Sequence, residues 1–269
     1  MKEYLRTLVQ ASPNPLQGRN IAREYLQARV LENMQKMGAF VPLAFQGGTA
    51  LRFLYGLRRF SEDLDFSLEN AKNAFDLEYY LQGLQNTFSA EGYALEVAYN
   101  TDRVVQSALL KFTGLPYELE LSAHQNENLS IKIEVDTNPP RGAAMETSLV
   151  RKYVFLNLHH YDRASLFAGK IHALLSRKFT KGRDVYDLLW YLSDPIWPPP
   201  NFVFLQNALM QTGWEGEVPT EKNWRLLLRD RMNDLDWERV ILDVDPFLEN
   251  TGDKEFLTKE NIIYRLIHR

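Results

Sequence analysis

The chain of 269 residues contains no cysteine. This absence excludes disulfide bridges, thiolate nucleophiles, and zinc or iron–sulfur centres built on cysteine. The neighbouring His159 and His160, and His172 further along, also lack a metal-ligand spacing such as His-Glu-x-x-His. Carboxylates and the metals that prefer oxygen ligands are the remaining route to catalysis.

Long apolar runs are missing as well. No stretch reaches the ~18 uncharged apolar residues that a membrane helix needs, and the N-terminal sequence MKEYLRTLVQASPNP lacks the apolar run of a signal peptide. We therefore expect a cytoplasmic protein with no membrane partner.

Neither sign of charge dominates, because the chain has 31 Lys and Arg residues and 35 Asp and Glu residues, which gives a net charge of −4. Such a chain does not bind nucleic acid by bulk charge, so any such role needs a local patch. Residues 151–195 hold eight basic and four acidic residues, whereas residues 215–255 hold six and twelve. These segments are either a basic and an acidic face or ordinary solvated helices.

The order of apolar residues predicts a mixed α/β first half and a helical second half. Two prolines in Asn138-Pro139-Pro140-Arg141-Gly142 separate the halves, and we predict domains at residues 1–145 and 146–269. Alternating or helical periodicity predicts strands at 63–68, 94–99, 104–112 and 129–137, and helices at 16–40, 49–57, 74–90, 163–179, 183–193, 201–212, 221–231, 236–249 and 258–267.

One pair of acids has a special context. Acids one residue apart occur nine times in the chain, so this spacing alone decides nothing. Asp63 and Asp65, however, alternate with Leu64, Phe66 and Leu68, which places both carboxylates on one face of a strand. Carboxylates held this close repel each other, and a bound Mg²⁺ or Mn²⁺ relieves the repulsion.

A glycine turn precedes this strand. Gly47 and Gly48 let the backbone approach a phosphate, and the helix that follows presents free N–H groups and a positive dipole end. Thr49 either caps that helix or binds a phosphate oxygen. Arg59 and Ser61 are further candidates for phosphate contacts, although a solvated arginine and a simple turn residue are equally consistent with the sequence.

A third acid is available in the alternating segment Ile131-Lys132-Ile133-Glu134-Val135-Asp136. Glu134, its rival Asp136 and Lys132 share a face of this strand. If the strand lies beside the first one, three carboxylates form a site that can hold two metal ions during phosphoryl transfer.

These motifs resemble those of the AbiEii/AbiGii nucleotidyltransferase toxins, which belong to the DNA polymerase β-like nucleotidyltransferase superfamily. The resemblance covers residues 45–192 and rests on four motifs: Gly47-Gly48-Thr49-Ala50-Leu51-Arg52, Arg59-Phe60-Ser61-Glu62-Asp63-Leu64-Asp65-Phe66, a helix carrying Lys170, and Arg183-Asp184-Val185-Tyr186-Asp187-Leu188.

The resemblance implies an α/β (α+β) nucleotidyltransferase fold, with a mixed β-sheet flanked by helices and a helical C-terminal half. It implies an enzyme that moves a nucleotidyl group from an NTP to an acceptor hydroxyl with Mg²⁺ or Mn²⁺. It also implies a toxin that a separately encoded antitoxin neutralises, with the 3′ end of a tRNA as one acceptor. The basic segment 151–195 would then contact the RNA backbone.

The predicted roles follow from the motifs. Asp63 and Asp65 hold the metal, with Glu134 (or Asp136) as third acid or base, and Gly47, Gly48, Thr49, Ser61 and Arg59 bind the nucleotide. Lys170 falls within an apolar helical arc, where it either reaches a nucleotide or extends its amine to water. Asp184 borders the buried stripe of the next helix and is predicted to face inward, where it pairs with Lys170 or a metal. Asp187 is predicted to point away and only to cap the helix or form a salt bridge. Lys170 and Asp184 are therefore assigned to the nucleotide pocket as catalytic residues.

Two other functions remain open at this point. One is a non-catalytic module that binds a nucleotide or a protein, and the intact acids argue against it. The other is an enzyme of the same fold that modifies a small molecule, such as an antibiotic hydroxyl.

Overall fold

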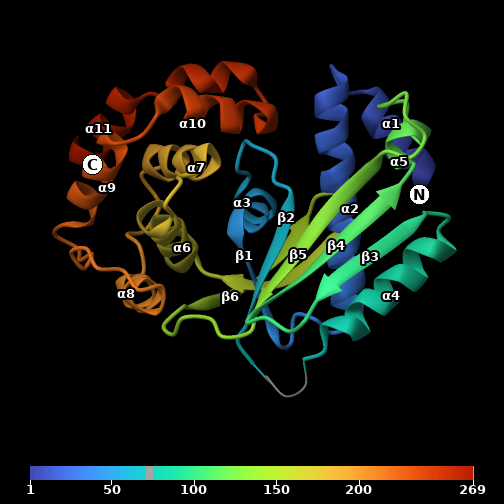
Figure 1. Ribbon diagram of the computed structural model, residues 1–269, viewed down its shortest axis with the longest axis horizontal. Helices are drawn as coiled ribbons and strands as arrows, with labels where there is room; N and C mark the ends of the chain where they lie inside the picture. The colour runs from blue at the N-terminus through green and yellow to red at the C-terminus, as the bar shows by residue number, and fades with distance from the viewer. Residues whose placement is uncertain (71–74, 269) are drawn as a thin grey trace. The chain divides into compact units, whose positions relative to one another are not determined.

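The computed structural model describes residues 1–70 and 75–268. Seven strands form one sheet in the order β3-β4-β5-β2-β1-β7-β6 (Figure 1). The pairs β2–β5 and β1–β7 are parallel, and β1–β2, β3–β4 and β4–β5 are antiparallel. The predicted mixed sheet is therefore confirmed. The strands are β1 (Leu43–Gln46), β2 (Asp63–Leu68), β3 (Leu95–Asn100), β4 (Val105–Thr113), β5 (Asn128–Asp136), β6 (Met145–Arg151) and β7 (Phe155–Tyr161).

The chain forms two compact units, and each is described by itself. Unit 1 comprises residues 1–56, 60–139 and 147–160, and unit 2 comprises residues 57–59, 140–146 and 161–269. The predicted domain division at residue 145 stays a prediction. Within the described ranges, no helix is long and apolar enough to cross a membrane.

Five helices lie within the described residues of unit 1. The longest, α2, begins after Asn14, whose side chain accepts a hydrogen bond from the Gln17 amide, with Pro15 in the first turn. Apolar side chains of β2, β4 and β5 alternate and are buried, and α2 contacts β5 while α4 contacts β3. The helices are α1 (Lys2–Gln10), α2 (Pro15–Lys36), α3 (Gly47–Tyr55), α4 (Leu77–Ala90) and α5 (Leu115–Glu118). The first residue of the predicted helix 74–90 lies outside the described residues.

Unit 2 is built mainly from helices. Its core contains the stacked rings of Phe167 and Tyr191, with centroids 4.4 Å apart, and Trp197 packs edge-on against Tyr191. Gly182 opens α7 at a close approach to α10, because an added Cβ would overlap the carbonyl oxygen of Val240. The helices are α6 (Arg163–Ser176), α7 (Gly182–Ser193), α8 (Phe202–Gln211), α9 (Trp224–Asn233), α10 (Trp237–Val244) and α11 (Lys259–His268), with 3₁₀ helices η2 (Asp245–Phe247) and η3 (Thr251–Phe256).

Sequence periodicity missed several elements. β6 and β7 lie in a region predicted to be mostly helical, and β1 was interpreted as part of a turn. In β7 the buried positions are Leu156, Leu158, His160 and Tyr161, and the polar histidine interrupts the apolar alternation. β6 is exposed at nearly every position, so no buried face marks it as a strand.

Candidate active site

Four charged side chains lie in two rows across strands β2 and β5 of unit 1. The parallel register pairs Asp63 with Lys132 and Asp65 with Glu134. Residues that are paired in register share a face of the sheet, and the opposite face is apolar because Leu64 and its alternating neighbours are buried. The fold therefore brings three predicted acids to one polar face.

The register separates Glu134 from its rival. Glu134 is level with Asp65, whereas Asp136 is level with Ser67, one row further along. Asp136 also accepts a hydrogen bond of 2.9 Å from the amide of Asn138. The register thus places Glu134 beside Asp65, whereas Asp136 is engaged at the end of its strand.

The glycine turn lies directly against this face. Gln46, the last residue of β1, is level with Asp65, and its side-chain amide donates a 2.7 Å hydrogen bond to Ser67 Oγ. Gly47 follows with φ +78°, and a Cβ at this position would overlap the Asp65 carboxylate. Glycine is needed here both for the positive φ and for the space, so the Asp65 carboxylate lies against the first residue of α3.

Helix α3 is fixed at both sides. The buried Thr49 hydroxyl donates to the carbonyl oxygen of Asp63, which joins α3 to the acid-bearing strand. The buried Arg52 guanidinium bonds Glu24 of α2 and packs over the Phe60 ring at 4.1 Å. Thr49 is thus a structural link, whereas its predicted phosphate contact stays a prediction.

Lys132 supplies a cation within the acid cluster. Its Nζ lies 2.5 Å from Glu134 Oε1. The hydrogen bond to Glu134 and the nearby charges of Asp63 and Asp65 raise the pKa of Lys132, against a smaller lowering by burial. This ammonium offsets part of the repulsion among the three carboxylates. Sequence alternation placed Lys132 on this face, but the site prediction left it out.

The donor set of this face suits a hard divalent ion. Across residues 1–70 and 75–268, no three acidic or histidine side chains converge into a ready metal cluster. Asp63 and Asp65 are partly exposed, and Gly47 leaves the space in which Asp65 sits. Asp63, Asp65 and Glu134 offer carboxylate oxygens and no sulfur ligand, which fits Mg²⁺ or Mn²⁺.

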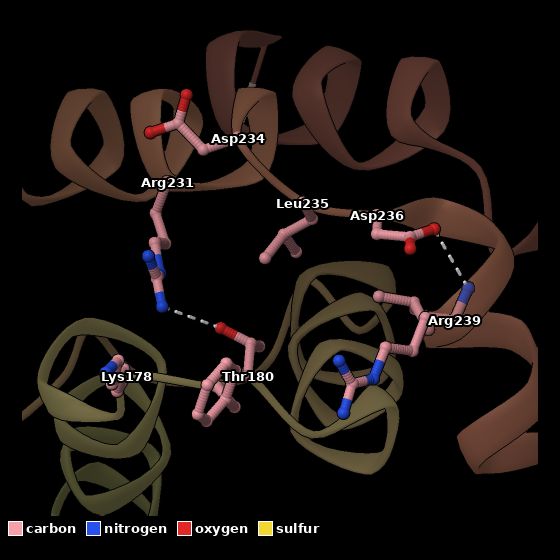
Figure 2. A pocket seen from close by; sticks show the side chains of 9 residues that line it. Lys178, Thr180, Arg231, Asp234, Leu235, Asp236 and Arg239 are labelled. Atoms are coloured by element: carbon pink, nitrogen blue, oxygen red, sulfur yellow. Dashed lines mark hydrogen bonds between the residues drawn. The ribbon is translucent and has the colours of Figure 1, made fainter.

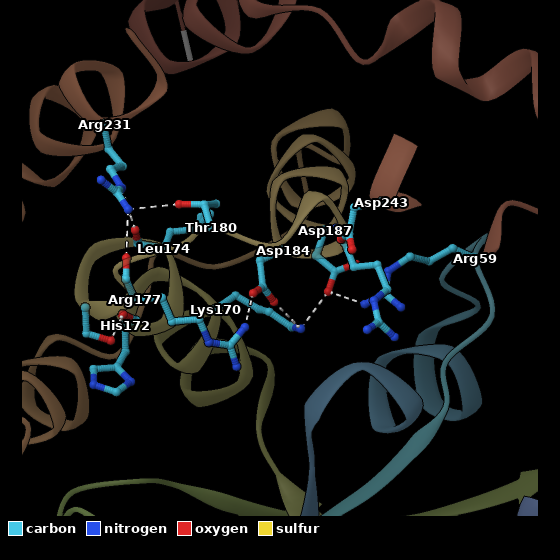
Figure 3. Close-up of polar contacts among 12 residues, drawn as sticks. Arg59, Lys170, His172, Leu174, Arg177, Thr180, Asp184, Asp187, Arg231 and Asp243 are labelled. Carbon is cyan, nitrogen blue, oxygen red and sulfur yellow. Dashed lines mark hydrogen bonds and ion pairs between the residues drawn. The ribbon is translucent and has the colours of Figure 1, made fainter. Parts of the chain in front are cut away.

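Unit 2 contains a separate buried ion network (Figure 3). Lys170 Nζ of α6 lies 3.0 Å from Asp184 Oδ1 and 2.7 Å from Asp187 Oδ2, both on α7. Arg59 binds Asp187 with two hydrogen bonds, of 2.6 and 2.7 Å, and Arg177 binds Asp184. Asp187 is 0% exposed and Arg59 is 2% exposed.

The ion pairs outweigh burial in setting the protonation states. Burial acts to lower the pKa of Lys170, but Asp187 and Asp184 raise it overall. Burial acts to raise the pKa of Asp184, yet Lys170 and Arg177 hold it below its ordinary value. At neutral pH the ammonium and this carboxylate are therefore both charged.

A family model, described as nucleotidyl transferase AbiEii toxin of a type IV toxin–antitoxin system, matches residues 29–259. The chain belongs to the AbiEii family. It is thus a nucleotidyltransferase of the toxin class, as the sequence motifs predicted. No curated protein matches the chain.

Two solved structures share the fold of this AbiEii protein. The nucleotidyltransferase toxin MenT4 of Mycobacterium tuberculosis is 14% identical, with a TM-score of 0.55, over 100% of this chain and 90% of its own. A Helicobacter pylori protein classed as a nucleotidyltransferase is 19% identical, with a TM-score of 0.50, over 88% of this chain and 91% of its own. At these identities the likeness supports the fold alone.

The remaining predicted residues of this AbiEii protein lie as follows. Gly48 is buried within α3, and the carbonyl of Ser61 accepts a 3.0 Å hydrogen bond from Gln27. Arg59 is engaged in the buried bidentate pair instead of being a solvated side chain.

The predicted orientation of Asp187 was wrong. Helical periodicity placed it away from the buried stripe of α7, but it is more deeply buried than Asp184 and binds both Lys170 and Arg59. The reason is that α7 packs against α6, α10 and α11, so it is buried nearly all round and a single apolar stripe does not define its inner side. The feature of the sequence that could have indicated a role for Asp187 is its position as the second acid of the Arg-Asp-x-x-Asp motif.

Proposed function

We propose that this AbiEii protein transfers a nucleotidyl group from an NTP to a hydroxyl acceptor in a Mg²⁺-dependent reaction. The observation that supports this most is the register of β2 and β5, which puts Asp63, Asp65 and Glu134 on one face beside Gly47. In this proposal the three carboxylates hold the metal, and Asp136 is the alternative third acid.

The N-terminus of α3 supports a phosphate-binding role for Gly47, Gly48 and Thr49. Gln46, the N-cap residue, makes no side-chain capping bond, so its own side chain does not compete for the first N–H groups of the helix. Those groups and the positive end of the helix dipole favour an anion. We assign the triphosphate to this turn, with Ser61 as a further donor.

The reaction exchanges one phosphorus–oxygen bond for another. The acceptor oxygen attacks the α-phosphorus, the bond to the bridging oxygen breaks, and pyrophosphate leaves. Glu134, or Asp136 in its place, takes the hydroxyl proton. A divalent ion, when bound, neutralises charge on the transferring phosphoryl group and lowers the pKa of the attacking hydroxyl.

Lys170 and Asp184 are proposed to contact the nucleotide, and Arg59 now belongs to their network. Asp187 joins this assignment because it binds Lys170 directly. Asp184 and Asp187 hold the Lys170 ammonium in place. Lys170 is therefore positioned more firmly than an exposed, flexible lysine would be.

The acceptor we propose is an RNA 3′ hydroxyl, with tRNA as the first candidate, and the family implies an antitoxin partner. The test is incubation with each α-labelled NTP, total RNA and Mg²⁺, with EDTA as the metal-free control. Label on RNA that disappears with EDTA is the expected result. Label on small molecules alone would favour an antibiotic-type enzyme, and no transfer to any acceptor would refute the proposal.

A further inference from the structure

Unit 2 contains a pocket of about 190 Å³ whose lining includes none of the predicted catalytic or nucleotide-binding residues (Figure 2). The loop between α6 and α7 forms one side, with Lys178, Phe179 and Thr180. The turn between α9 and α10 and the first turns of α10 form the other, with Asp234, Asp236 and Arg239 among its lining residues. Every lining residue belongs to unit 2.

Phe179 is the unusual side chain of this pocket. It is 65% exposed, although a phenyl ring gains about 1.5–3 kcal/mol when it is buried. Its ring lies 5.6 Å from Lys178 Nζ and 5.7 Å from Arg239 Cζ. Cations at this distance interact with the ring face. An exposed aromatic ring beside two cations is an arrangement on which a nucleobase can stack, with a phosphate close by.

The charges around the ring favour an anionic ligand. The loop and the start of α7, Arg177-Lys178-Phe179-Thr180-Lys181-Gly182-Arg183, carry four basic residues and no acid. Two of these are engaged, because Arg177 binds Asp184 and the Arg183 guanidinium packs over Phe247. Lys178 and Lys181, and Arg239 across the pocket, are exposed.

The opposite side of the pocket has hydrogen-bond acceptors. Asp236 caps α10 by accepting a bond from the Arg239 amide, and Asp234 follows the end of α9; both are exposed. Two carboxylates would repel a bare phosphate, but they accept hydrogen bonds from the amino and imino groups of a base edge. The pocket therefore combines a stacking ring, phosphate-binding cations and base-edge acceptors.

We propose that this pocket binds one nucleotide of a single-stranded RNA. The base stacks on Phe179, the phosphate contacts Lys178 and Arg239, and the base edge donates to Asp234 or Asp236. This proposal extends the proposed function, because it gives the RNA acceptor a binding site in unit 2, but it concerns binding alone and needs no chemistry.

The test is binding of a fluorescent 12-nucleotide single-stranded RNA, followed by anisotropy without NTP. Phe179→Ala should weaken binding about 5- to 150-fold, which is the effect of losing one stacked base. The matched control is Phe256→Ala, which removes an equally exposed ring (64%) from η3 of the same unit. It should bind like the wild type, and Phe179→Trp should keep most of the affinity.

Charge variants add a second readout. Lys178→Gln should reduce the slope of log affinity against log salt by about 0.7. Equal losses in Phe179→Ala and Phe256→Ala would overturn the proposal. So would competition by polyglutamate as strong as that by RNA of equal charge, because the pocket would then recognise only negative charge, as an acidic protein partner provides.

The results distinguish a failure of the pocket assignment from a failure of the proposed function. Asp63→Asn should lose transfer yet keep RNA affinity. Phe179-dependent RNA binding by a protein that shows no transfer would refute the enzymatic proposal and leave the pocket assignment standing. If Phe179→Ala changes neither the rate of transfer to RNA nor the RNA affinity, the pocket assignment is refuted and the enzymatic proposal stands.

Discussion

The buried pair between Arg59 and Asp187 gives the sharpest stability prediction. Both side chains are almost completely buried and joined by two short hydrogen bonds. Removing Asp187 leaves the Arg59 charge without this carboxylate, and removing Arg59 leaves Lys170 as the cation beside Asp187. Breaking a buried pair in this way typically costs about 3–5 kcal/mol. We expect Arg59→Met or Asp187→Leu to lower the free energy of unfolding by this amount, which corresponds to a fall in Tm of roughly 6–20 °C.

The double variant should recover much of this loss. With both groups replaced by apolar side chains no charge of the pair remains, and Lys170 keeps Asp184 as its partner. Replacement of a whole buried pair is often close to neutral. Asp245→Asn is the control, because it removes an exposed pair with Lys254 at 3.0 Å and should cost less than about 1 kcal/mol.

Urea unfolding curves of the wild type and these four variants measure this coupling. The reasoning is refuted if either single variant costs no more than Asp245→Asn. It is also refuted if the double variant loses the sum of the two single losses, because the charges would then be independent of each other.

Two further predictions concern pH and the third acid. Burial, with a smaller effect from Arg177, lowers the pKa of His172, so the unfolded chain binds a proton that the folded chain excludes. This contribution to stability is complete above the unfolded pKa of ~6.5 and declines as pH falls toward the folded pKa. His172→Gln should therefore flatten the decline in Tm between pH 7.5 and 5.5. An unchanged slope would show that other groups cause the decline. Glu134→Gln should reduce nucleotidyl transfer by about 100-fold or more, whereas Asp136→Asn should change it less than about threefold; the reverse order would move the third acid to Asp136.

Local patterns predicted the part of the site that lies on strands. Alternation of charged and apolar residues located β2 and β5 and put Asp63, Asp65 and Glu134 on one face, because a strand with one buried face carries that period. Which of Glu134 and Asp136 lies beside Asp65 required the register, which depends on long-range pairing that no local pattern encodes.

The unit 2 network shows the limit of such patterns. The sequence left open whether Arg59 contacts a phosphate or is solvated, and it predicted Asp187 to be an outward residue of an amphipathic helix. Their bidentate pairing joins positions 128 residues apart in the sequence. The burial of α7 against three helices comes from tertiary packing, so periodicity within one helix did not indicate it.

The central claim is that the carboxylates on the β2–β5 face catalyse nucleotidyl transfer, and substitution of Asp63 tests it most directly. The measurement is the initial rate of label transfer from α-labelled NTP in Mg²⁺, with Asp102→Asn as an exposed control from the same unit. Asp63→Asn should lower the rate at least about 100-fold, the scale of losing a group that stabilises transition-state charge, with Tm within about 2 °C of the wild type. Transfer by Asp63→Asn at the rate of Asp102→Asn would contradict the account.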